Sequence, residues 1–311
     1  MLPALLSDRF LPDVDSDDEL EQGDADVLTE QVVGEIVGGG DRLRRMVRIT
    51  QKPIGRSPRS NLATYVGMFD LVRKLFAETQ DAKAKDFDAG RFSFNLPAGR
   101  CPVCEGLGTT SIEMMFMPSV TAPCAACHGA RYNKDTLAVK WNDRNIAEIL
   151  ALNVEEAGEV FGGHRGIKRS LDTMMKLGLG YLRLGQPATE LSGGESQRIK
   201  LTSELQRPQK GGTLYLLDEP SSGLHPADMD LLLTHLDELV TKGNTVVMVE
   251  HDIRIAAQAD WVIDLGPGAG AQGGTVVAAG TPRDVARSKS SLTAPFLEKH
   301  LRRRVALLRK G

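Results

Sequence analysis

The sequence predicts an α/β fold in its C-terminal third, joined to a largely helical part that carries a cysteine module. Two observations support this prediction. From residue 191 onward, short apolar runs alternate with amphipathic segments, and this alternation is typical of a mainly parallel, buried sheet. Between residues 99 and 133, glycines and two cysteine pairs punctuate the chain.

The elements before residue 191 are predicted from the spacing of apolar side chains. Residues 41–50 end in a short apolar alternation that suits a strand. Residues 62–79 and 145–185 have helical spacing, and the loop 162–166 interrupts the second range. Residues 13–30 hold nine acidic side chains and no lysine or arginine, which predicts a solvated loop.

The elements after residue 191 follow the α/β alternation. Helices are expected at 195–205, 226–241 and 253–258, and strands at 213–218, 245–250, 261–266 and 273–280. The strands end in polar or glycine-rich turns, which is where parallel sheets place binding residues.

Length and composition limit the class of protein. The chain has 311 residues, 41% of them hydrophobic, and a net charge of -3, so it has enough apolar material for one or two domains and is no general polycation. No apolar run reaches the length of a membrane span, and the start lacks a basic region followed by a long apolar one. We therefore expect a cytoplasmic protein without a membrane partner. The tail, 299–311, is interpreted as a solvated basic helix, with nucleic-acid contact as the alternative.

The four cysteines form two CxxC pairs, Cys101 with Cys104 and Cys124 with Cys127, separated by 19 residues. Four thiolates at this spacing predict a closed, structural Zn²⁺ site. The alternatives are buried free thiols, a redox pair or an iron–sulfur centre. His128 follows the last cysteine directly, and we interpret it as a bystander because four thiolates already fill a tetrahedral shell.

A second group of residues suits nucleotide chemistry. The apolar run 213–218 delivers Asp218 and Glu219 at its end, where Asp218 would hold Mg²⁺ through water and Glu219 would act as general base. His251 follows the next strand and could orient the attacking water. Ser192 precedes a helix whose free N–H groups form an anion site. Each signal has an ordinary structural alternative, and their order and spacing make the set specific.

These motifs resemble those of a known family. LSGGESQR, LLDEP, SSGLH and VEHD are similar to the signature, Walker B, D-loop and H-loop motifs of ABC-type ATPases. With QKPIGRSPRSNLATYVGMFD, AGRC and the cysteine pairs, the chain more narrowly resembles the C-terminal half of UvrA, the damage-recognition component of the bacterial excision-repair nuclease. The resemblance covers about residues 42–298.

The resemblance implies a partial ABC-ATPase nucleotide-binding domain with an inserted helical signature domain and a four-cysteine zinc module. It implies a remnant of the ATPase core with an acidic loop at 1–50, the signature domain at 51–190 with the zinc module at 101–131, the ATPase core at 191–298, and the tail. Gln51 matches the Q-loop glutamine and joins Glu219 and His251 as a catalytic candidate. The ATP and Mg²⁺ candidates are Ser192, Gly193, Gly194, Glu195 and Asp218.

The resemblance implies a DNA-binding ABC-type ATPase that recognises damage during nucleotide excision repair. The implied cofactors are ATP, Mg²⁺ and structural Zn²⁺. The implied partners are double-stranded DNA, the B component of the excision-repair nuclease, and a second ABC half or homodimer partner that supplies a P-loop. Candidate DNA-phosphate contacts are Arg56, Arg59, Arg91 and Arg100, with an ordinary structural role as the equal alternative.

The main departure from the family is that the sequence contains no GxxxxGK[ST] motif. Smaller departures are the wording at Thr50-Gln51-Lys52 and at Leu62. Because the motif is missing, we expect that the chain starts just after a P-loop and that the isolated chain hydrolyses ATP weakly or not at all. Its signature segment would complete a site whose P-loop belongs to another unit. Alternatives are a catalytically incomplete fragment and a UvrA-like paralogue of the drug-resistance kind. The cysteine pairs argue against an ABC transporter subunit.

Overall fold

The structure is a computed structural model that describes residues 37–114, 117–208, 210–268 and 274–308. The predicted acidic loop at 13–30 lies outside these residues, as do most of the predicted 1–50 segment and the last residues of the tail. The chain divides into two compact units. Unit 1 comprises residues up to Leu217 and Gly223–Val247, and unit 2 comprises Asp218–Ser222 and residues from Met248 onward.

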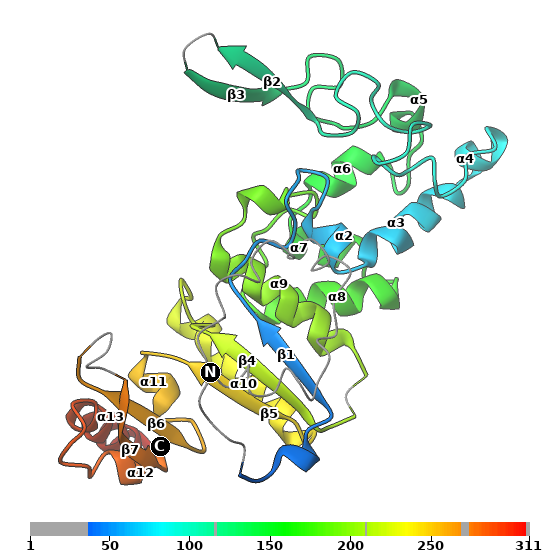
Figure 1. The fold of residues 1–311 in the computed structure, drawn as a ribbon. Helices are drawn as coiled ribbons and strands as arrows, with labels where there is room; N and C mark the ends of the chain where they lie inside the picture. The colour runs from blue at the N-terminus through cyan, green and yellow to red at the C-terminus, as the bar shows by residue number, and fades with distance from the viewer. Residues whose placement is uncertain (1–36, 115–116, 209, 269–273, 309–311) are drawn as a thin grey trace. The chain divides into compact units, whose positions relative to one another are not determined.

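Unit 1 contains a run of short helices (Figure 1). They are α2 (Leu62–Tyr65), α3 (Met68–Ala77), α4 (Gln80–Ala84), α5 (Lys134–Leu137), α6 (Ile146–Ala151), α7 (Val154–Val160) and α8 (Arg165–Lys176). Asparagine side chains cap several of them: Asn61, Asn145 and Asn153 each form a capping box, which satisfies N–H groups of the first turn.

The helical spacing of residues 62–79 predicts a single helix, and the structure contains two. The chain breaks at Gly67, where φ is 72°, a left-handed conformation that glycine adopts without steric cost. The rings of Phe69 and Phe76 from α3 and of Phe94 are buried. The ring centroids of Phe69 and Phe94 are 5.5 Å apart. Aromatic packing therefore holds α3 to the segment that precedes the cysteines.

The central sheet has the order β1-β4-β5, with β1 at Arg45–Ile49, β4 at Thr213–Asp218 and β5 at Thr245–Val249. β1 and β4 are parallel, with Arg45 opposite Thr213 and Ile49 opposite Leu217. Helix α9 (Gly193–Gln206) precedes β4 along the chain, and α10 (Pro226–Thr241) connects β4 to β5. The predicted positions of β1, α9, β4, α10 and β5 are confirmed to within about two residues.

The cysteine segment contains an element that apolar spacing did not predict. β2 (Thr109–Met114) and β3 (Met117–Pro123) form an antiparallel pair between the two CxxC motifs. Figure 1 draws them as a two-stranded arm. The 19 residues between the cysteine pairs are therefore mainly a hairpin.

Unit 2 holds the remaining elements, α11 (Ile253–Ala256), β6 (Val262–Gly266), β7 (Thr275–Gly280), α12 (Pro282–Val285) and α13 (Ala294–Leu308). The prediction that all strands after 191 share one mainly parallel, buried sheet is wrong here. β6 and β7 form their own antiparallel pair. Trp261, Ile263 and Leu265 are 61–62% exposed. The apolar composition of residues 261–266 therefore does not show that this segment is buried.

No helix among the described residues has both the length and the apolar character needed to cross a bilayer.

Candidate functional site

The four cysteines converge on one point. Their sulfur atoms all lie within 4.8 Å of one another, and all four residues are buried. The Sγ atoms of Cys104 and Cys127 are 3.6 Å apart. This distance is close to the separation of about 3.8 Å between thiolates that bind one zinc tetrahedrally at 2.3 Å. The donor set therefore fits a single Zn²⁺ ion.

The backbone around the cysteines is shaped for such a centre. The N–H of Gly108 donates to Cys104 Sγ at 3.3 Å, which stabilises a thiolate. Gly106 has φ 84°, and a Cβ at this position would stand 1.8 Å from the carbonyl oxygen of Phe94. Glycine is therefore required there by both conformation and space.

The cysteine pKa values differ in direction. Hydrogen bonding to the backbone of Cys127 lowers the pKa of Cys124 to about 7, and burial raises the pKa of Cys127 to about 12. His128 is exposed and is no member of the converging group. Its φ of 51° is a left-handed turn conformation. This agrees with the interpretation that His128 is not a metal ligand.

The signature segment begins helix α9 with a complete capping box. Ser192 N–H donates to Glu195 Oε2 at 2.7 Å, and Glu195 N–H donates to Ser192 Oγ at 3.3 Å. Among the described residues, no hydrogen bond starts at the N–H of Gly193 or Gly194. These two groups belong to the unsatisfied donors of a helix N-terminus, which attracts anions.

A residue that the sequence interpretation missed, Tyr181, supports this cap. Its hydroxyl donates to Glu195 Oε1 at 2.5 Å. Burial and this hydrogen bond raise the pKa of Tyr181 to about 12. Burial also opposes ionisation of Glu195, but the hydrogen bonds from Tyr181 and Ser192 outweigh it and hold the pKa of that carboxyl below its usual value. Tyr181 lies ten residues before the LSGGESQR motif, and its role depends on a hydrogen bond that only the fold creates.

Gln51 lies directly against the signature segment. A Cβ at Gly193 would stand 3.0 Å from Gln51 Cβ and 3.1 Å from its Oε1. Gln197, one turn into α9, donates to the carbonyl of Ile49 at 3.1 Å. The end of β1 and the start of α9 are therefore held together, which brings two predicted site residues into one place.

A partly buried ion pair joins the rest of α9 to β1. Arg45 donates to both oxygens of Glu204, at 2.8 and 3.2 Å, and Glu204 is buried. Arg207 lies 3.4 Å from the same carboxylate. Two cations thus compensate one buried anion, a geometry that makes removal of either side costly. The signature helix is positioned by the strand that leads into Gln51.

The predicted acidic pair lies in unit 2, in a segment with strained backbone. Glu219 has φ 44°, a conformation that non-glycine residues rarely adopt. Its N–H donates to the carbonyl of Val249 at 2.9 Å. His251 Nδ1 lies 3.4 Å from Glu219 Oε1, and the two side chains are 75% and 44% exposed. Glu219 and His251 therefore meet at an open surface, and the exposed Asp218 immediately precedes Glu219.

Glu250 organises this group and was also missed. Its Oε1 accepts from Ser221 N–H at 3.0 Å, and its Oε2 accepts from His251 N–H at 3.3 Å. One carboxylate thus joins the turn after Glu219 to the histidine. The signal was available, because Glu250 stands beside His251 within VEHD.

Three of the four candidate DNA arginines make intramolecular contacts. Arg91 donates to Thr136 Oγ1 at 3.0 Å and lies over the Phe87 ring. Arg59 and Arg100 each lie 3.6 Å from Glu105 Oε2, while Arg56 is exposed. These contacts give Arg91, Arg59 and Arg100 a structural role, and DNA contact by any of the four stays a prediction.

Comparisons with known proteins agree with this geometry. The chain is 55% identical over 261 residues to UvrABC system protein A of Micrococcus luteus, and 49% identical over 277 residues to that of Aquifex aeolicus. These alignments cover 84% and 88% of the chain, but 26% and 30% of the relatives. No family model matches.

A solved structure agrees as well. UvrA2 from Deinococcus radiodurans superposes with a TM-score of 0.79 at 56% identity, covering 84% of this chain and 33% of that one. The chain thus spans between a quarter and a third of the length of these proteins. The chain matches a segment of UvrABC system protein A.

Proposed function

We propose that the chain is the signature-bearing part of a UvrA-like, DNA-binding ABC ATPase of nucleotide excision repair. The observation that carries this proposal is the N-terminus of α9, where Ser192 and Glu195 form a closed cap and the N–H groups of Gly193 and Gly194 stay available. This arrangement receives an anion. The 49–55% identity to UvrABC system protein A supports the assignment of that anion as ATP.

The roles divide between two sites. Ser192, Gly193 and Gly194 would contact the phosphates of an ATP held by the P-loop of another ABC unit. Asp218 would hold Mg²⁺ through water, Glu219 would accept the proton of the attacking water, and His251 would orient it. The second site needs a P-loop, and the sequence contains no GxxxxGK[ST] motif.

The cysteine centre would hold one structural Zn²⁺, which contributes folding energy to residues 101–131. We also propose the predicted division into a signature domain at 51–190 and an ATPase core at 191–298. Double-stranded DNA and the B component of the excision-repair nuclease are the proposed partners. The 56% identity to UvrA2 supports a UvrA-like paralogue as a second candidate function, and the missing P-loop motif supports a catalytically incomplete fragment.

The first test is ATP hydrolysis by the purified chain. We expect turnover at the background level, because the backbone nest and lysine of a P-loop, which cradle the phosphates, are missing from the sequence. Glu219→Gln should then leave the measured rate unchanged. Turnover that disappears in Glu219→Gln would contradict this, since it would place a complete hydrolytic site within the chain.

A further inference from the structure

We infer that the cavity between α12 and α13 in unit 2 binds the phosphate backbone of double-stranded DNA. The inference rests on the proposed function, since it assigns the proposed DNA partner to a place on the chain. None of the four arginines named from the sequence lies in this region.

Charge is concentrated here. Among the residues whose side chains the structure describes, 281–302 contain five lysines and arginines against two acidic residues, a net charge of +3, whereas the whole chain carries -3. A local excess of this size on a weakly acidic protein creates a field that attracts polyanions.

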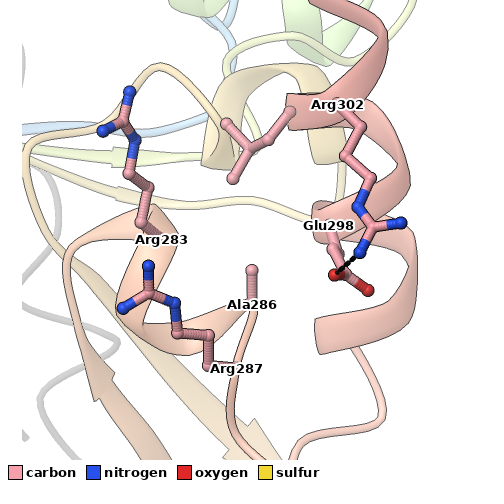
Figure 2. A pocket seen from close by; sticks show the side chains of 6 residues that line it. Arg283, Ala286, Arg287, Glu298 and Arg302 are labelled. Atoms are coloured by element: carbon pink, nitrogen blue, oxygen red, sulfur yellow. Dashed lines mark hydrogen bonds and ion pairs between the residues drawn. The ribbon is translucent and has the colours of Figure 1, made fainter. Parts of the chain in front are cut away.

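The described side chains form a defined cavity within this region. Arg283, Ala286 and Arg287 line it from α12 and the residues that follow, and Glu298, Leu301 and Arg302 line it from α13. Its volume is about 300 Å³. Figure 2 shows the arginines on both sides of the cavity. Apolar walls beneath charged groups strengthen their field at the opening.

The acidic side chains of the region are already engaged. Glu298 Oε1 lies 2.6 Å from Arg302, as the dashed line in Figure 2 marks. Asp284 Oδ2 accepts hydrogen bonds from the N–H and hydroxyl of Thr281, which caps α12. Arg283 and Arg287 are exposed, so their guanidinium groups can present paired N–H donors to phosphate oxygens.

The packing of α13 favours DNA over a lipid surface. A basic helix that lies on a membrane needs a free apolar face. In α13 that face is used internally: Leu297 is fully buried with Ala257 and Val285, and Leu301 packs against the same cluster. Phe296 is exposed on this helix, so anionic lipid vesicles are kept as a separate arm of the test.

The experiment measures binding of a fluorescent 30-base-pair DNA to the full chain by anisotropy, over a series of salt concentrations. Each phosphate contact contributes about 0.9 to the slope of log affinity against log salt. Arg283→Ala/Arg287→Ala should therefore reduce the slope by about 1.8, and Glu298→Gln should tighten binding, because Arg302 is released. The matched control is Arg165→Ala/Lys176→Ala, which removes two exposed cations from α8 in unit 1 and should keep the slope.

The outcomes separate the inference from the proposed function. If the wild-type chain binds DNA and the Arg283/Arg287 variant keeps its slope, or the control loses as much, the inference is wrong while the proposed function stands. If the wild-type chain binds no DNA, both are wrong. Preferred binding of phosphatidylserine vesicles or a polyglutamate peptide would also overturn the inference. Circular dichroism of each variant checks folding, which these exposed substitutions should leave intact.

Discussion

At the residue scale, the capping box of α9 decides how the signature segment is presented. Glu195 uses one oxygen for the N–H of Ser192 and the other for the hydroxyl of Tyr181. Both bonds need the ionised carboxylate to be strong. The orientation of Ser192 therefore depends on a residue outside the motif and on the charge of a residue within it.

We predict that Glu195→Gln lowers the free energy of unfolding at pH 7 by about 1 kcal/mol or less, the size of a helix-capping contribution. The folded-state pKa of Glu195 is lowered, so its stabilisation is present above the unfolded pKa and is lost as pH falls through the folded value. The difference between wild type and variant should then shrink at pH 3.5.

Urea unfolding at both pH values measures this difference. Glu159→Gln, on the exposed face of α7, is the matched control and should have little effect at either pH. An equal loss for Glu195→Gln at pH 7 and pH 3.5 would show that the carboxylate charge plays no part in the cap.

At the element scale, the cysteine module is built from two turns and a hairpin. The turn at the first cysteine pair needs a glycine at 106, because of the Phe94 carbonyl. The hairpin β2–β3 connects the pairs. The apolar cluster of the module consists of the four buried cysteines, and the partly buried apolar residues that pack against it among the described residues are Leu107 and Ala130. The proposed Zn²⁺ would therefore supply much of the stability of the module.

We predict one zinc per chain and its loss in Cys124→Ser. The variant should become sensitive to protease within residues 101–131 while the central sheet stays resistant. His128→Ala is the matched control and should keep the metal, because His128 is exposed and outside the converging group. Elemental analysis of protein prepared without chelator gives the answer, and protein free of metal would contradict the zinc interpretation.

The elements also show what spacing can and cannot predict. The apolar pattern located β1, α9, β4, α10 and β5, although β4 is buried along most of its length and β5 has no buried residue. It did not predict the break at Gly67, which depends on one backbone conformation. It also did not predict the antiparallel β6–β7 pair, because its exposed apolar row gives the same pattern as a buried strand.

At the scale of the whole molecule, the candidate residues form two separate groups. Gln51 and Ser192–Glu195 belong to unit 1, whereas Asp218, Glu219 and His251 belong to unit 2. Motif order predicted the members of both groups. It could not predict Tyr181, since the role of that residue comes from a side-chain hydrogen bond that tertiary structure creates. Glu250 lies within VEHD and could have been named from the motif, but its bond to Ser221 is visible only in the structure.

The proposed function predicts that Ser192 and the glycines after it complete an ATP site whose P-loop belongs to another ABC unit. The most direct test mixes the full chain with a P-loop-bearing ABC half of UvrA type whose own signature serine is replaced by arginine, and measures ATP turnover. Ser57→Arg, at an exposed position, controls for the added charge. We predict that the wild-type chain and Ser57→Arg raise turnover and that Ser192→Arg does not. Equal turnover with wild type and Ser192→Arg would contradict the claim.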